Sequence, residues 1–358
     1  MKTINEIIAE FNIEADIQSY GNGHINDTYL AQPNSYILQK INTDIFKDPA
    51  GLMNNIEKVT GFLRKKLIAA GKNPERGTLT VVKTGDGKNF YNDNGACYRV
   101  YKFVEDTITI EAAESAEDMY RAGKGFGNFL ALLDDFPALE LSETIVDFHH
   151  TPKRLQALEK AISEDKAGRV NSVSEEIKFA LDRAEMTKTV INGLQSGDIP
   201  TRVTHNDTKI NNILFDAKTR GAVCVIDLDT VMPGSALYDF GDAMRIGAST
   251  AAEDETNLDL VGFDVEKFTA FTKGYAEEAA RFLTSAEIEL LAFSAKLLTF
   301  ECGVRFLTDY IDGDTYFKIH RPEHNLDRAR NQFKLVADIE AKEAELKRIA
   351  TEIMNSAK

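Results

Sequence analysis

The chain has 358 residues, 43% hydrophobic and 28% charged, which is enough apolar material for a sizeable core. Its formal net charge of −15 argues against nucleic acid or an anionic membrane as partner, because phosphates require a basic face. The 3 cysteines are dispersed and no apolar run reaches membrane-spanning length, so we expect no disulfide framework, no membrane span and a cytoplasmic location.

The N-terminal part is predicted to be rich in strands. Apolar spacing indicates helices over residues 4–12 and 51–70, and β-branched runs indicate strands over 17–20, 36–40, 78–82 and 97–101. A turn with two glycines, Gly21 and Gly23, lies between the first strands and would let the backbone approach a ligand closely. Spacing alone fits an ordinary hairpin equally well. The chain lacks the G-x-x-x-x-G-K-S/T pattern of a P-loop.

From about residue 110 onward the pattern is predominantly helical, which places a lobe boundary between residues 1–104 and 105–358. The glycine cluster Gly123-Lys124-Gly125-Phe126-Gly127 sits inside an apolar helical stripe, so we interpret it as a close-packing helix and not a nucleotide loop. Adjacent His149 and His150 indicate a surface or packing role. Further helices are expected within 153–195, from a capping box at Thr284 through Asp309, and from 327 to the end.

Two short segments carry the chemistry. The first reads His205-Asn206-Asp207 and continues to Asn212, which is an H-x-D-x-x-x-x-N spacing, and the second is a strand that ends at Asp227. In a phosphoryl-transfer site the first Asp accepts the proton of the attacking hydroxyl, while the Asn and the later Asp hold magnesium against the nucleotide phosphates. Capped turns also collect Asx residues, but the agreement of several independent spacings favours the catalytic interpretation of Asp207, Asn212 and Asp227.

These segments resemble the aminoglycoside phosphotransferase-like kinases, a family that includes aminoglycoside, choline, homoserine and methylthioribose kinases. Within it the similarity is to the N-acetylhexosamine 1-kinases and spans nearly the whole chain, through residues 20–29, 36–42, 98–105, 203–214, 226–234 and 301–307. The resemblance implies an α+β, protein-kinase-like, two-lobed fold, with a small antiparallel-sheet N-lobe for the nucleotide and a large, mainly helical C-lobe for catalysis and substrate.

The resemblance also implies roles for other residues. The nucleotide side would comprise Gly23 in the covering loop, Gln39 and Lys40 on a strand, Glu57 on the following helix, and Phe103, Val104 and Glu105 at a hinge whose backbone pairs with adenine. The substrate side would comprise His24, Asn211 and Arg305, and structural support would come from His205 and Asp239. Asp239 opens a D-F-G sequence, but by position the metal Asp of the family is Asp227.

The sequence departs from the family at one strand. Gln39 falls where a lysine for the α- and β-phosphates is expected, and Lys40 should face the opposite side because strand side chains alternate. Either the register is shifted or another group handles the phosphates. Glu57, the candidate partner of the strand cation, is therefore about equally compatible with a solvated helix glutamate.

The resemblance implies ATP- and Mg²⁺-dependent phosphorylation of the C1 hydroxyl of N-acetylglucosamine or N-acetylgalactosamine. Two alternatives stay open: a kinase of the same fold for another small alcohol, such as an aminoglycoside, choline or homoserine, and a nucleotide-binding pseudokinase. The preferred sugar, ATP versus GTP, and the oligomeric state also stay open, with a monomer as the working expectation.

Overall fold

The computed structural model describes residues 2–21, 26–32 and 35–358. Two compact units divide the chain, the first formed by Met1–Ile110, Leu132–Val146 and Asn212–Pro233, and the second by Glu111–Ala131, Asp147–Asn211 and Gly234–Lys358. The lobe boundary expected at residue 104 stays a prediction. By its contacts the first unit continues to Ile110 and includes two later segments. One of them, Asn212–Pro233, is joined to it by the pairing of β9 (Ile213–Asp216) with β7 (Thr107–Ile108).

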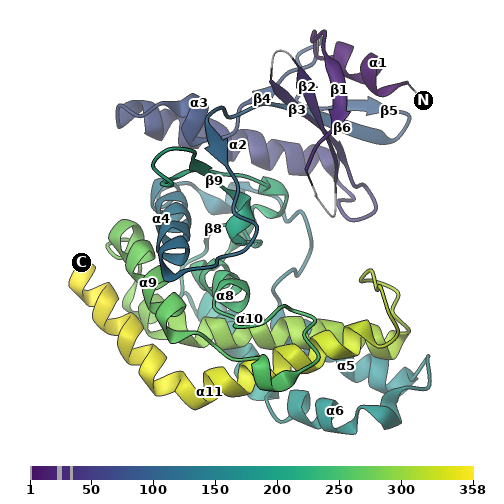
Figure 1. Ribbon diagram of the computed structural model, residues 1–358, viewed down its shortest axis with the longest axis vertical. Coiled ribbons are helices and arrows are strands. Elements are labelled where there is room, and N and C mark those ends of the chain that lie inside the picture. Colours follow the sequence, from purple (N-terminus) through teal and green to yellow (C-terminus); the bar gives the residue numbers. More distant parts are fainter. Residues whose placement is uncertain (1, 22–25, 33–34) are drawn as a thin grey trace. The chain divides into compact units, whose positions relative to one another are not determined.

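The first unit is built on an antiparallel sheet of six strands, whose order is β1-β2-β3-β6-β4 with β5 also paired to β6 (Figure 1). Its elements are α1 (Ile4–Ala9), β1 (Asp16–Ser19), β2 (Asp27–Gln32), β3 (Tyr36–Ile41), α2 (Pro49–Ala69), α3 (Pro74–Gly77), β4 (Val81–Val82), β5 (Tyr91–Asp93), β6 (Ala96–Lys102) and β7 (Thr107–Ile108). A second sheet has the order β10-β9-β7, with β9 at Ile213–Asp216 and β10 at Ala222–Val225. The 3₁₀ turns of this unit are η1 (Ala138–Glu140) and η5 (Leu228–Thr230).

One face of the larger sheet carries an apolar core. Ile7, Ile8 and Phe11 from the α1 region pack with strand residues, among them Leu38 of β3 and Val100 of β6. Because side chains alternate along a strand, the neighbours of Leu38 and Val100, namely Gln39 and Arg99, lie on the other face. The strand expected over 78–82 is shorter, since Asn73 caps α3 and Thr78 ends that helix.

The second unit is helical, as expected. Its elements are α4 (Ala116–Leu132), α5 (Thr151–Glu164), η2 (Val170–Ser172), α6 (Ser174–Leu181), η3 (Ala184–Lys188), α7 (Thr189–Ser196), β8 (Arg202–Thr204), η4 (Ile210–Asn212), β11 (Met232–Gly234), α8 (Ala236–Gly247), η6 (Leu258–Leu260), α9 (Val265–Ala279), α10 (Ser285–Asp312) and α11 (His324–Ala357). Three of these elements have residues in both units: Leu132 of α4, Asn212 of η4, and Met232 and Pro233 of β11 belong to the first unit. Within the region 153–195, where helices were expected, η3 separates α6 from α7.

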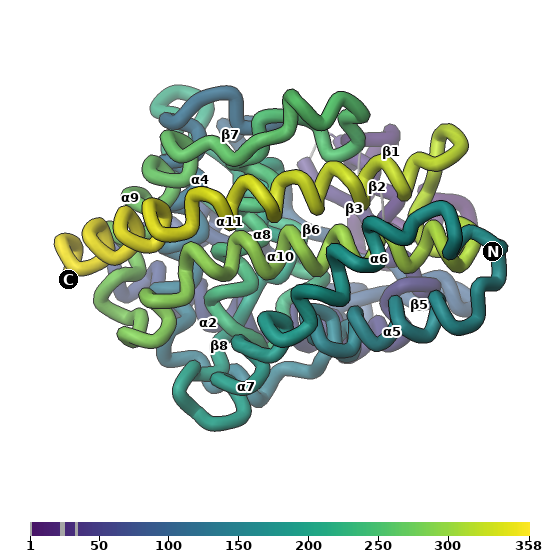
Figure 2. The backbone as a smooth tube through the Cα atoms, turned by 90° about the horizontal axis from the view of Figure 1, so that it is seen from below, coloured from purple at the N-terminus to yellow at the C-terminus, as the bar shows by residue number. Residues whose placement is uncertain are grey.

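Two long helices, α10 and α11, run side by side through this unit, as Figure 2 shows. The predicted capping box begins α10, with Thr284 and Glu287 exchanging hydrogen bonds. Helices α5, α6, α10 and α11 share a buried cluster that includes Leu158, Phe300 and Leu307. No helix in the described part of the chain is long and apolar enough to cross a membrane.

The interpretation of the 123–127 glycine cluster as a helix is confirmed, because these residues lie within α4. A Cβ atom on Gly123 would lie 2.2 Å from the carbonyl oxygen of Phe271, and one on Gly274 would lie 2.0 Å from that of Tyr120. The backbones of α4 and α9 therefore touch at these glycines, where any larger residue would force the helices apart.

Candidate active site

The loop that carries Asp207 belongs to the second unit and is held mainly through its backbone. The carboxylate of Asp239, at the start of α8, accepts the backbone N–H of His205 at 2.9 Å and that of Asn206 at 2.7 Å. Asp242, one turn later, accepts the N–H of Thr208 at 3.0 Å. Burial raises the pKa of Asp239, and the two donated N–H groups act in the opposite direction.

Asp207 has a cation beside it. The Nζ atom of Lys209 lies 2.8 Å from Oδ1 of Asp207. Although burial lowers the pKa of Lys209, the charge of Asp207 outweighs it, so the pKa lies above its ordinary value. Lys209 was assigned no role from the sequence. The signal was its position two residues after the Asp, on the same loop.

His205 is fully buried beneath this loop. Its ring lies edge-on to Phe126 and Phe129 of α4, with centroids 5.8 and 6.0 Å away, and its Nδ1 accepts the N–H of Asp207 at 3.3 Å. The strand before the loop is anchored as well, because Arg202 forms a buried ion pair with Glu287 at 2.6 Å. The loop thus rests on a rigid helical scaffold.

The other two residues of the motif, Asn212 and Asp227, belong to the first unit. Asn212 directly precedes β9 and Asp227 follows the paired strand β10, where the N–H of Ile226 donates to the carbonyl of Asn212 at 2.9 Å. Asp227 has φ 58° and ψ 55°, the left-handed conformation that side chains with a Cβ adopt at a cost of about 1 kcal/mol. Strand pairing thus brings these two positions next to each other.

An amide and a carboxylate fit magnesium, which prefers oxygen ligands and takes the remaining positions from water and substrate phosphates. No group of three or more His, Cys, Asp or Glu side chains poised for a metal occurs among the described residues. The pair Asn212 and Asp227 therefore suits an ion brought in with a nucleotide better than a resident metal held by protein alone.

The strand positions expected near the phosphates lie as anticipated, whereas the helix position Glu57 has a different partner from the expected one. Gln39 and Lys40 lie on β3 in the register anticipated, with Gln39 paired to Arg99 across β6. The expected pairing of Glu57 with a cation of this strand is corrected: Glu57 forms its ion pair with Lys83 and accepts from Asn89 at 2.8 Å. Both partners follow β4, because α2 turns Glu57 toward that segment.

At the expected hinge, Phe103, Val104 and Glu105 follow β6. The N–H of Phe103 donates to the carbonyl of Ser35 at 2.8 Å, and the carbonyl of Val104 accepts from Thr107 at 2.7 Å. Gly23 and His24, the expected covering-loop residues, lie outside the described residues.

The substrate-side candidates Asn211 and Arg305 lie in the second unit. The Oδ1 atom of Asn211 is buried without a hydrogen-bond partner in the described part of the chain, so it is an acceptor that a ligand could satisfy. The guanidinium of Arg305 lies 5.6 Å from the ring centroid of Phe148 and 5.5 Å from that of Phe317. Such aromatic contacts hold a cation without neutralising it.

A second guanidinium, that of Arg154, also contacts Phe148. Arg154 donates through Nη2 to the carbonyl of Phe148 at 2.7 Å. Burial, together with the positive charge of Arg305, lowers the pKa of Arg154. Neither arginine has a carboxylate within ion-pair distance in the described part of the chain. The surface around Phe148 is therefore cationic and rich in hydrogen-bond donors.

The sequence did not reveal a buried group of hydrogen-bonded side chains that includes Glu301, one helical turn before Arg305. Glu301 does not pair with Arg305; its Oε1 lies 2.8 Å from Nδ1 of His149 and its Oε2 accepts from Thr151 at 2.6 Å. The other ring nitrogen of His149 lies 3.4 Å from the carbonyl of Asn206, the residue before Asp207. The signal available in the sequence was a glutamate within an apolar helix face, which requires a partner.

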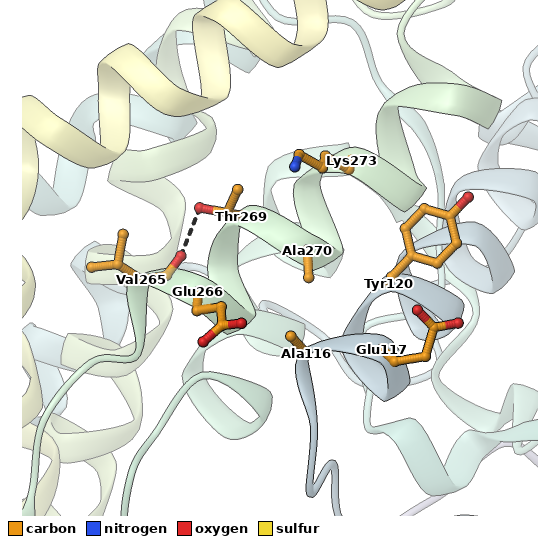
Figure 3. A pocket seen from close by; sticks show the side chains of 8 residues that line it. All are labelled: Ala116, Glu117, Tyr120, Val265, Glu266, Thr269, Ala270 and Lys273. Atoms are coloured by element: carbon orange, nitrogen blue, oxygen red, sulfur yellow. Dashed lines mark hydrogen bonds between the residues drawn. The ribbon is translucent and has the colours of Figure 1, made fainter.

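A separate cleft of about 540 Å³ lies between α4 and α9, lined by Tyr120, Glu266 and Lys273 among others (Figure 3). Thr269 donates to the carbonyl of Val265 there at 2.7 Å. The residues expected from the sequence to act in catalysis or binding are not among those that line it. Since it brings together no chemistry of the motif, it is not the candidate active site.

Comparison with known proteins finds one family model and several solved structures that match this chain. The model of a family described as "Phosphotransferase enzyme family" matches residues 16–275. The structure of a microcompartment-associated aminopropanol kinase is similar with a TM-score of 0.63 and 16% identity, covering 96% of this chain and 97% of that one.

Two further solved structures are similar. Spectinomycin phosphotransferase in complex with ADP and spectinomycin has a TM-score of 0.57 at 12% identity, covering 94% of this chain and 95% of that one. Ethanolamine kinase from Plasmodium vivax has a TM-score of 0.53 at 15% identity, covering 92% of this chain and 84% of that one. At such identities the similarity shows the fold alone, so the expected protein-kinase-like α+β fold is confirmed.

Proposed function

Because the chain belongs to the phosphotransferase enzyme family, we propose that it is a kinase that transfers the γ-phosphoryl group of ATP to the C1 hydroxyl of an N-acetylhexosamine. The resemblance of its motifs to the N-acetylhexosamine 1-kinases supports the reaction and the sugar. The catalytic loop supports the chemistry, since it presents Asp207 beside Lys209 on a backbone fixed by Asp239.

In the proposed reaction Asp207 accepts the proton of the C1 hydroxyl as O1 attacks the γ-phosphorus. The bond between that phosphorus and the β–γ bridging oxygen breaks, and ADP leaves with the electron pair. An anomeric hydroxyl is more acidic than an ordinary alcohol, so a carboxylate is a sufficient base. Lys209 orients the carboxylate of Asp207 through the 2.8 Å contact.

Asn212 and Asp227 would hold magnesium, which when bound neutralises charge on the phosphates. Their oxygen donors and adjacent strand positions fit that ion. Adenine would pair with backbone groups of Val104 and Glu105, because the N–H of Phe103 is already donated to Ser35. Gly23, Gln39 and Lys40 remain proposed neighbours of the nucleotide.

The observation that carries the choice of substrate class is the cationic surface around Phe148. Substrates that bear ammonium groups need carboxylates in the wall that binds them, whereas this wall presents Arg305 and Arg154. Guanidinium donors suit the hydroxyl and acyl oxygens of an N-acetylated sugar. Asn211 and His24 are proposed to complete the substrate side.

A substrate panel tests this function. Purified protein with MgATP is incubated with N-acetylglucosamine, N-acetylgalactosamine, glucose, aminopropanol, ethanolamine, choline, homoserine and spectinomycin, while ADP release is followed and the phosphorylated position is assigned by NMR. Phosphate on C1 of an N-acetylhexosamine supports the proposal. Turnover of the amine-bearing compounds alone would keep the kinase and reject the sugar, and ATP binding without any turnover would favour a pseudokinase.

A further inference from the structure

The amide of Gln39, where the phosphate-binding lysine was expected, is occupied by protein groups. Its Nε2 donates to Oγ1 of Thr28 at 3.1 Å, and its Oε1 accepts from Nε of Arg99 at 3.0 Å. Both ends of the amide are therefore used within the sheet. Gln39 thus orients Arg99, and its neutral amide cannot supply the positive charge that a lysine would offer a phosphate at this position.

Arg99 is a buried charge that forms an ion pair with a buried carboxylate. Only 1% of its surface is exposed, and its Nη1 donates to Oδ1 of Asp229, which is itself 3% exposed. The second carboxylate oxygen of Asp229 accepts from Nδ2 of Asn26 at 2.7 Å. Asn26 in turn accepts the N–H of Asn42 at 3.0 Å, so the pair is embedded in a connected polar network.

This network ends at the proposed metal site. Asp229 lies in η5, the single 3₁₀ turn that directly follows Asp227. On the other side of the same turn, Nδ2 of the fully buried Asn55 on α2 donates to the carbonyl of Val231 at 3.0 Å. The left-handed backbone at Asp227 is thus followed by a turn that the sheet and α2 hold at two points.

We propose that Arg99 is a positioning residue that sets the metal-binding geometry of Asp227 through its buried ion pair with Asp229. The proposal rests on the proposed function, because it takes Asp227 to be a magnesium ligand. A buried ion pair contributes little net stability compared with an apolar pair of the same volume, so its value lies in fixing one arrangement of the turn. In this arrangement Arg99 positions the metal ligand Asp227 and does not bind the phosphates.

The test measures metal binding without the sugar. Mn²⁺, read by electron paramagnetic resonance, is titrated into the protein saturated with ADP, for wild type, Arg99→Met and Asp229→Asn. Outer partners of metal ligands typically contribute 10- to 100-fold to metal affinity, so each variant should bind Mn²⁺ roughly ten-fold more weakly. Arg64→Met, which removes a half-exposed ion pair with Glu75 in the same unit, is the matched control and should leave Mn²⁺ affinity unchanged.

Arg99→Lys keeps a positive charge opposite Asp229 and is a second variant should Arg99→Met fail to fold. It should lose less Mn²⁺ affinity than Arg99→Met, although it lacks the second donor that contacts Gln39. The apparent KM for the sugar should not move in any folded variant. A lower Tm with unchanged Mn²⁺ affinity in Arg99→Met and Asp229→Asn would overturn the positioning role.

The failure of this inference is distinguishable from that of the proposed function. Wild type that binds no Mn²⁺ with ADP would overturn both. Wild type that binds Mn²⁺ but phosphorylates no sugar would reject the sugar assignment alone, and the comparison of the Arg99 variants would still decide the positioning role.

Discussion

The Nδ1 atom of His149 lies 2.8 Å from Oε1 of Glu301, and both side chains are buried. Through its other nitrogen His149 reaches the carbonyl of Asn206 at 3.4 Å, so a carboxylate on α10 is connected to the residue before the proposed base. His149 and Glu301 therefore support the catalytic loop, and this role requires no contact with the nucleotide or the sugar.

Replacing His149 by Ala should destabilise the protein by about 3 kcal/mol, because the buried Glu301 carboxylate would lose its imidazole partner and keep the hydrogen bond from Thr151. The free energy of unfolding, measured with urea, checks this. His150→Ala is the control: His150 caps α5 only through a weak acceptor contact of 3.3 Å with the N–H of Lys153, so it should cost about 1 kcal/mol or less. Equal losses for the two variants would contradict the role given to His149.

Glu301 should make stability depend on acid pH. Burial alone would raise the pKa of Glu301, but the charge of His149 and the hydrogen bonds outweigh it and hold the pKa below its ordinary value. A depressed carboxyl pKa contributes stability above the unfolded value of about 4.3, and that stability is lost as pH falls through the folded value. The difference in free energy of unfolding between wild type and Glu301→Gln should therefore become smaller below about pH 4. A gap independent of pH would contradict this assignment.

Asp207→Asn should abolish turnover while ADP affinity stays within a few-fold of wild type, because the amide cannot take the proton and the loop is held by Asp239 and Asp242. Loss of a general base typically costs about 10²- to 10⁴-fold in kcat. Lys209→Met should lower kcat less, since it removes only the cation that orients the carboxylate. Steady-state kinetics and calorimetry with ADP check both, and an active Asp207→Asn variant would remove Asp207 from the mechanism.

Arg305→Met should raise the KM for the N-acetylhexosamine by roughly ten-fold or more, since a hydrogen bond from a charged donor contributes about 1.5–3 kcal/mol. The KM for ATP should not change. Arg281→Met is the matched control, because Arg281 also lies over a ring, that of Phe282, at 4.8 Å. A rise in the sugar KM of the same size in Arg281→Met would show that Arg305 has no specific role.

Gly123→Ala should destabilise the protein by about 1–3 kcal/mol, because the new methyl group would overlap the carbonyl of Phe271 and push α4 and α9 apart. Gly61→Ala on α2 is the matched control, since no atom lies within 4 Å of its added Cβ. That variant should gain about 0.5–1 kcal/mol from helix propensity. Thermal unfolding of both variants checks the pair, and a stabilised Gly123→Ala variant would contradict the close contact.

The sequence by itself determined the features that depend on local patterns. Alternation placed Gln39 on the face opposite Leu38, the capping box at Thr284 marked the start of α10, and the spacing from His205 to Asp227 indicated phosphoryl transfer. These follow from the periods of strands and helices and from motif spacing, which need no knowledge of distant partners.

Only the tertiary structure decided which distant groups meet. The partner of Glu57 is Lys83 and not a β3 cation. Glu301 contacts His149 and Thr151, which lie 152 and 150 residues earlier, and Arg99 contacts Asp229, 130 residues later. A buried charge demands a partner, but no local pattern states which one, because many chain paths bring different residues together. The sequence could therefore predict the need for these contacts, whereas packing alone selected their members.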